Sequence, residues 1–117
     1  MHKIMDDSLV ERGADIVINK WVQLKANERL CIVTSTVHMK EAELLKKIAQ
    51  KISNSVSIVT VKQEGIHVGQ WFDEHPNAFN DYDVIIGASD YSIVTTKACE
   101  EALRKGKKFL SLPLSTN

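Results

Sequence analysis

Two short aliphatic runs constrain the fold of this chain more than any other feature of its sequence. Residues 30–33 read Leu-Cys-Ile-Val and residues 84–86 read Val-Ile-Ile, without the polar alternation of a half-exposed strand. Strands that read this way are buried on both faces, as in parallel sheets covered by helices on each side. We therefore predict strands at 29–34 and 83–88, and apolar segments at 56–61 and 107–112 complete a set of four.

The segments between the predicted strands carry helical patterns. Residues 37–53 place charged side chains opposite an apolar face, with Glu43 and Lys47 at the favourable i, i+4 spacing. Helices are also predicted at about 8–24, where Ser8 and Glu11 have capping-box spacing, and from about 93 to 105, ended by Gly106. In chain order, the expected apolar faces are Leu9, Val10, Ile16, Val17, Trp21 and Leu24; Met39, Ala42, Leu45, Ile48, Ala49 and Ile52; and Val94, Ala98, Cys99, Ala102 and Leu103.

Residues 62–75 show neither a helical nor a strand period. We predict an exposed connection at 65–69, anchored to the body by Trp71 and Phe72, and a short helix at 76–79 opened by Pro76. The whole reads as a helix followed by β-α-β-α-β-α-β, which requires right-handed crossovers. The predicted fold is one α/β domain at 1–117, a doubly wound parallel sheet of about four strands in the order 2-1-3-4, Rossmann-like or flavodoxin-like, with an N-terminal helix.

Charge and composition argue against several classes of function. Lys+Arg and Asp+Glu both number 15, so the formal net charge is zero and no basic stripe offers a nucleic-acid surface. The first seven residues lack the apolar run of a signal peptide, and no stretch reaches the roughly 20 apolar residues of a membrane span. Cys31 and Cys99 lie in apolar segments without CxxC spacing, which predicts buried free thiols and a cytoplasmic protein.

In the predicted strand order, the connections that follow the first and third strands leave for opposite faces of the sheet. Open α/β sheets bind ligands at such a switch point, beyond the carboxyl ends of the strands. Two hydroxyl-rich loops meet there, each before a predicted helix whose unpaired N–H groups and dipole favour an anion. The competing interpretation is that these side chains only cap the helices that follow. The predicted ligands of a phosphate, sulfate or carboxylate are Ser35, Thr36, His38, Ser89, Asp90, Tyr91, Ser92 and Thr96.

Other kinds of site find less support. Phosphate-cradling loops use glycine, but Val37 stands where a flavodoxin-like loop would have it, and Thr34 stands where a receiver domain would have its phosphoacceptor aspartate. His67, Asp73 and His75 share one segment, yet they lack a fourth member and the close spacing of a zinc site. We therefore predict no catalytic residue and no metal ligand in this chain.

Four stretches follow the pattern of a known family. They are Arg-Gly-Ala-Asp-Ile-Val at 12–17, the segment 22–34 with Asn-Glu-Arg before its strand, Tyr-Ser-Ile-Val-Thr-Thr-Lys-Ala at 91–98, and Ser-Leu-Pro at 111–113. Together they resemble the N-terminal domain of the thermophilic-type metalloaminopeptidases, the aminopeptidase T and leucyl-aminopeptidase group. The chain departs from the family pattern at Ala26-Asn27, where the family has Pro-Gly, at Thr95, where it has histidine, and at Leu114-Ser115.

The resemblance implies a non-catalytic N-terminal domain whose parent is a metal-dependent peptidase. In that family, paired divalent ions such as zinc or cobalt are held by Glu, His, Tyr and Asp residues of a later domain, so no cofactor is expected within this segment. A group of ring-opening, iron-dependent dioxygenases shares the architecture. The expected partners are a C-terminal catalytic domain and a second copy of the chain. The alternatives are a stand-alone module that binds a small anion or nucleotide, and an interaction domain that pairs through a sheet edge or through Trp71 and Phe72.

Overall fold

Four parallel strands form one sheet in the order β2-β1-β3-β4, as the sequence predicts. The computed structural model describes residues 11–62, 66–89 and 92–112. The strands are β1 (Leu30–Thr34), β2 (Val56–Thr60), β3 (Val84–Ala88) and β4 (Lys108–Ser111). β1 is an inner strand, and its first residue, Leu30, lies opposite Val56 of β2 and Val84 of β3.

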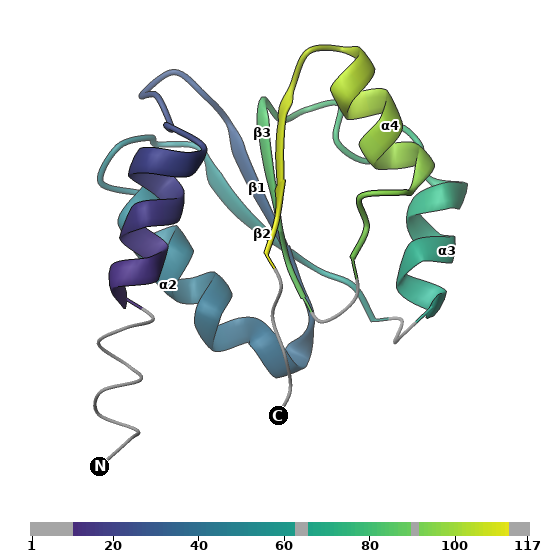
Figure 1. Ribbon diagram of the computed structural model, residues 1–117, viewed down its shortest axis with the longest axis horizontal. Helices are drawn as coiled ribbons and strands as arrows, with labels where there is room; N and C mark the ends of the chain where they lie inside the picture. Colours follow the sequence, from purple (N-terminus) through teal and green to yellow (C-terminus); the bar gives the residue numbers. More distant parts are fainter. Residues whose placement is uncertain (1–10, 63–65, 90–91, 113–117) are drawn as a thin grey trace.

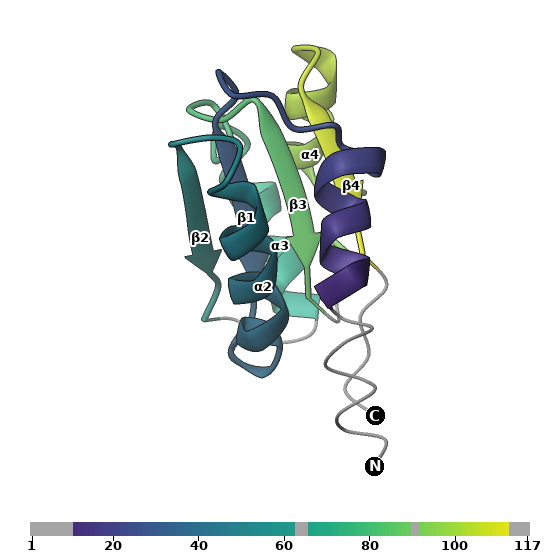
Figure 2. The same ribbon diagram turned by 90° about the vertical axis from the view of Figure 1, so that its left-hand side faces the viewer.

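Helices cover both faces of this sheet (Figure 1). The N-terminal helix, residues 11–21, and α2 (Met39–Ala49) lie on one face, and α3 (Ile66–Glu74) and α4 (Lys97–Arg104) lie on the other. Figure 2 shows the first pair side by side in front of the sheet, α2 nearer β2 and the N-terminal helix nearer β4. Within the described ranges, no helix combines the length and apolarity needed to cross a bilayer.

The inner strands divide the core into two layers. Every residue of β1 and β3 is buried, and successive side chains of a strand point to opposite faces. Leu30 and Ile32 pack on the side of the N-terminal helix and α2. Cys31, Val33 and Ile85 pack on the side of α3 and α4. The uninterrupted aliphatic runs therefore result from a sheet that is covered on both faces, as expected.

The prediction of an exposed connection at 65–69 is wrong, because α3 begins at Ile66. Its residues Val68 and Phe72, four positions apart, are buried, and the Phe72 ring stacks on Phe79 with ring centroids 5.3 Å apart. A helix of nine residues that contains Gly69 shows little periodicity, and tertiary packing stabilises it instead. Phe72 does anchor the segment, as predicted.

The N-terminal helix confirms only part of the predicted apolar face. Val17 and, just past the helix, Leu24 are buried as predicted. Ile16 and Trp21 are instead 38% and 61% exposed, whereas Ala14 and Ile18, which the prediction left out, are buried. Residues 16–18 are all aliphatic, so the pattern fits two faces, and packing on the sheet selects the one that contains Ile18. The helix ends at residue 21 in a π-helical turn, Val17–Trp21, and the predicted capping residue Ser8 and the apolar Leu9 and Val10 lie outside the described residues.

Two other helices are shorter than predicted. α2 spans Met39–Ala49 rather than 37–53, after a 3-10 turn at Thr36–His38, and four of its predicted core residues are buried. α4 begins only at Lys97, so Val94 precedes it, and Val94 and Leu103 are exposed rather than buried. Residues 76–81 form turns instead of a helix. The confirmed features are buried Ala42, Leu45, Ile48 and Ala49 in α2, buried Ala98, Cys99 and Ala102 in α4, and Gly106 with φ of 80° just past α4.

An ion pair joins the residue before β1 to the residue before β3. The backbone N–H and the Nε of Arg29 donate to Asp83 Oδ2 at 2.8 and 3.1 Å. These hydrogen bonds, together with the guanidinium charge, hold the pKa of Asp83 below its ordinary value. The pair therefore links the two inner strands where both begin.

We expect this pair to stabilise the fold only while Asp83 is ionised. Because the pKa of Asp83 is lower in the folded chain, its contribution is present above the unfolded pKa of about 3.9 and is lost as the pH falls through the folded value. Asp83→Asn should lower the Tm by a few degrees at pH 7, and by progressively less toward pH 2, in thermal melts followed by circular dichroism. Glu74→Gln, at an exposed position, is the control. If Asp83→Asn lowered the Tm by the same amount at pH 7 and at pH 2, this account would be contradicted.

Candidate functional site

The carboxyl ends of β1 and β3 form the switch point of the sheet. β1 leads into α2 on one face, whereas β3 leads toward α4 on the other, so the two connections diverge here (Figure 1). The buried Thr34 joins the two ends, because its Oγ1 donates to the carbonyl oxygen of Ala88 at 2.8 Å. Thr34 thus has a structural role at this end of the sheet.

The turn after β1 contains two of the predicted ligands in a distinctive state. The His38 side chain is 2% exposed, and its Nδ1 lies 3.1 Å from Glu41 Oε1. An ionised carboxylate can only accept, so Nδ1 carries the hydrogen of this bond. Within the described part of the chain, Ser35 Oγ and His38 Nε2 are buried side-chain atoms without a hydrogen-bond partner. This turn therefore holds unused hydrogen-bonding capacity in its interior.

The other predicted ligands differ from this pair. Thr96 is 3% exposed, and its Oγ1 donates to the Ile93 carbonyl at 2.6 Å, so its one hydroxyl hydrogen is already used. Ser92 is exposed, and its Oγ accepts from the Val94 N–H at 3.4 Å. Of the rest, Ser89 is buried and hydrogen-bonded or otherwise paired, Thr36 is exposed, and Asp90 and Tyr91 lie outside the described residues.

The N-termini of α2 and α4 are satisfied differently. At α4, Thr96 Oγ1 accepts from the Cys99 N–H at 3.3 Å, and Asp73 Oδ1 accepts from the Lys97 N–H at 3.0 Å. At α2, the N-cap residue His38 makes no side-chain capping bond, nor does Ser35 at the start of the preceding 3-10 turn. Capping therefore does not account for Ser35. The sequence pattern missed Asp73 as a cap because it lies 24 positions before Lys97.

His67, Asp73 and His75, which the sequence brings together as conceivable ligands of a surface metal ion, make other contacts. His67 Nδ1 pairs with Gln70 Oε1 at 2.8 Å, His75 Nδ1 donates to the Trp71 carbonyl at 2.7 Å, and Asp73 caps α4. In the part of the chain that the structure describes, no three His, Cys, Asp or Glu side chains gather as metal ligands. The residues present do not fit a divalent ion, and we derive no step through one.

Both cysteines are buried free thiols, as predicted. Burial raises the pKa of Cys31 to about 12 and that of Cys99 to about 11. Each thiol is therefore protonated at neutral pH, and only the thiolate is a nucleophile. Neither cysteine has the environment of a catalytic residue.

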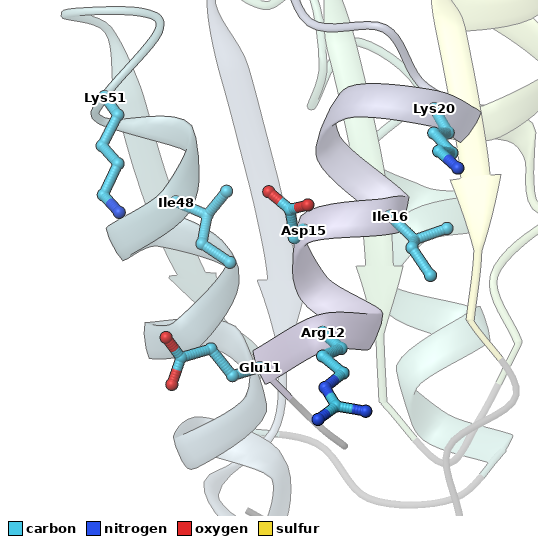
Figure 3. Close-up of a pocket in the computed structure, with 7 residues that line it drawn as sticks. All are labelled: Glu11, Arg12, Asp15, Ile16, Lys20, Ile48 and Lys51. Carbon is cyan, nitrogen blue, oxygen red and sulfur yellow. The ribbon is translucent and has the colours of Figure 1, made fainter. Parts of the chain in front are cut away.

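A shallow groove separates the N-terminal helix from α2 (Figure 3). Its acidic and basic side chains are interspersed with two isoleucines, so groups of one charge do not converge on a common point. One of its carboxylates, Asp15, accepts from Asn19 Nδ2 at 2.8 Å. The lining residues are Glu11, Arg12, Asp15, Ile16, Lys20, Ile48 and Lys51, and they include none of the predicted ligands.

Comparison with known proteins gives one structural likeness. No family model matches the chain, and no curated protein matches its sequence. Wild-type AmpT from Thermus thermophilus has a similar structure, with a TM-score of 0.60 and 12% sequence identity. The match covers 91% of this chain and 36% of AmpT, so the chain spans about a third of that protein. At this identity, the likeness shows the fold alone.

Proposed function

We propose that this chain is the non-catalytic N-terminal α/β domain of a protein built like the metalloaminopeptidases, and that its parent is a metal-dependent peptidase. The observation that carries the proposal is the extent of the likeness to AmpT, an aminopeptidase T, which includes 91% of this chain. Residues 12–34 and 91–98 resemble the same family in sequence. The fold and the sequence pattern thus support the same parent.

The chemistry of the described residues supports a structural role within that parent. The two thiols are buried and protonated, and two of the histidines make local hydrogen bonds within and just after α3. In the proposed parent, a divalent ion such as zinc or cobalt would be held by residues outside this segment. This domain would then shape the substrate cleft or an interface with a C-terminal catalytic domain.

An activity assay tests the non-catalytic part of the proposal. The purified 117-residue chain is incubated with aminoacyl-p-nitroanilides and Zn²⁺, Co²⁺ or Mn²⁺, and p-nitroaniline release is followed by absorbance. We expect no turnover above the blank that contains metal alone. AmpT under the same conditions shows that the assay works. Turnover that requires the chain and disappears with a chelator would overturn the proposal.

The gene tests the proposed parent separately. The proposal requires a reading frame that continues beyond codon 117 into a segment with Glu, His and Asp residues suited to two metal ions. A stop codon at that point, or an unrelated domain, would contradict it. The two experiments are independent, because an inactive 117-residue chain is expected whether or not the reading frame continues into a metal-binding domain.

Pairing through Trp71 and Phe72 is not favoured as an alternative function. Phe72 is fully buried on the inner side of α3, and Trp71 is half-buried and stacked on His75 with ring centroids 4.0 Å apart. These rings contact their own domain and offer little surface to a partner. Association of two copies through the outer strands β2 and β4 stays a prediction, checked by light scattering at high concentration.

A further inference from the structure

We propose that the turn at residues 35–41 binds a small oxyanion, the phosphate or carboxylate group of a ligand. The groups that would hold it are Ser35 Oγ, His38 Nε2 and the N-terminus of α2. The proposal concerns this chain alone and holds whether or not the domain belongs to a peptidase.

The first support is the state of the His38 ring. Its side chain is almost completely buried, and Glu41 fixes it through Nδ1. That contact leaves Nε2 as the remaining polar atom of the ring, and no described group hydrogen-bonds to it. Buried polar atoms in folded proteins are nearly always hydrogen-bonded, so an unpartnered one calls for an explanation. A bound ligand supplies one for Nε2. A protonated ring would donate from Nε2 to an anion while Nδ1 donates to Glu41.

The second support is Ser35, at the carboxyl end of β1. Its backbone is extended, with φ of −117° and ψ of 170°, as is typical of a residue that caps a helical turn. Its hydroxyl nevertheless makes no capping bond, and Oγ is buried without a hydrogen-bond partner in the described ranges. The hydroxyl hydrogen is therefore available to a ligand oxygen.

The third support is the contrast between two helix N-termini in the same molecule. α4 has its first turn capped by the side chains of Thr96 and Asp73, whereas the N-cap residue of α2 makes no side-chain cap. The Met39 N–H already donates to the Thr36 carbonyl of the preceding 3-10 turn. The N-terminus of this 11-residue helix still carries a partial positive charge, and an anion there would take the place of the missing side-chain cap. The switch point of an open α/β sheet is also where such folds bind ligands.

The donor chemistry selects an anion over a metal ion. Ser35 Oγ and the helix N–H groups donate, and His38 Nε2 donates as well when both ring nitrogens carry a hydrogen, so the set matches the acceptor oxygens of a phosphate or carboxylate. The Glu41 carboxylate contacts Nδ1, at a different position of the ring, and the charge of a protonated ring would separate it from the anion. A metal ion would need several ligands, and the described residues gather no such set.

Nuclear magnetic resonance tests the proposal directly. The full ¹⁵N-labelled chain is titrated with inorganic phosphate and, separately, with acetate, at constant ionic strength set with chloride. We expect saturable shifts of the His38 Nε2 resonance and of the amides of residues 39–41. Saturation by phosphate alone, or by acetate alone, identifies which group the turn selects. Saturation by neither anion would overturn the proposal.

Variants establish which side chains are responsible. Ser35→Ala and His38→Gln should each weaken binding by about tenfold or more, the loss expected for one hydrogen bond to a charged group. Ser55→Ala and His67→Gln alter exposed residues of the same types and should retain wild-type affinity. Circular dichroism shows whether His38→Gln folds. Should it not fold, Ser35→Ala decides, because it removes a hydroxyl that bonds to nothing described. Unchanged affinity in Ser35→Ala would contradict the proposed site.

Discussion

Replacing Phe72 by alanine is expected to lower the free energy of unfolding by about 3–5 kcal/mol. Phe72 is among the largest fully buried side chains, and its ring stacks on Phe79 and makes a T-shaped contact with Trp71. Truncation removes this apolar surface from the core and leaves a cavity between α3 and the sheet, which the short helix can fill only in part. Urea unfolding, followed by circular dichroism and by tryptophan fluorescence, measures the loss.

Trp21→Ala is the matched control for Phe72→Ala. It also removes a large aromatic side chain from a helical residue, but Trp21 is 61% exposed and is expected to contribute less than about 1 kcal/mol. Equal losses in the two variants would show that α3 does not pack on the sheet as described. The comparison therefore tests the element that the sequence pattern missed.

Ile18→Ala is expected to destabilise the domain by about 2–5 kcal/mol, whereas Ile16→Ala should change stability by less than about 1 kcal/mol. The two isoleucines lie two positions apart in the N-terminal helix, with Ile18 fully buried and Ile16 38% exposed. They share the same chemistry and nearly the same place in the chain, so the difference between them isolates burial. Chemical unfolding of both variants under identical conditions provides the measurement.

If Ile16→Ala were more destabilising than Ile18→Ala, the N-terminal helix would have to pack with Ile16 and Trp21 toward the sheet, as the sequence pattern predicts. Small losses in both variants would instead mean that the N-terminal helix contributes little to the fold. Either result would require a different core from the one in which Ile18 packs with Leu30 and Ile86.

The sequence predicts the sheet well because the strands carry an unambiguous pattern. Leu30 to Val33 and Val84 to Ile86 are apolar without interruption, and this pattern requires cover on both faces. The simplest doubly wound arrangement of such strands has the order 2-1-3-4, which the structure confirms. The helices are less predictable, because their pattern depends on the choice of phase and length. Among the side chains of α3 that the structure describes, the large buried ones are Val68 and Phe72, and contacts distant in sequence stabilise the helix.

The candidate site is predictable only in its location. The loops at the ends of β1 and β3 follow from strand order, but eight polar residues in them look equivalent in the sequence. Only the structure distinguishes Thr96, whose hydroxyl already donates to Ile93, from Ser35 and His38, which retain unpaired buried atoms. The cap that Asp73 provides for α4 depends on a contact between separate helices, which no local pattern contains.

The pairing of β1 with β3 affects how the chain folds while it is being synthesised. Leu30 aligns with Val84, so β1 leaves the ribosome 54 residues before its inner neighbour. At about 5–20 residues per second, this delay lasts roughly 3–10 s. During that time the nascent chain can pair β1 only with β2, and the opposite edge of β1 stays open to other unfolded chains. Chaperones that bind aliphatic segments could reach Leu30 to Val33 in this interval. In the folded domain these residues are buried.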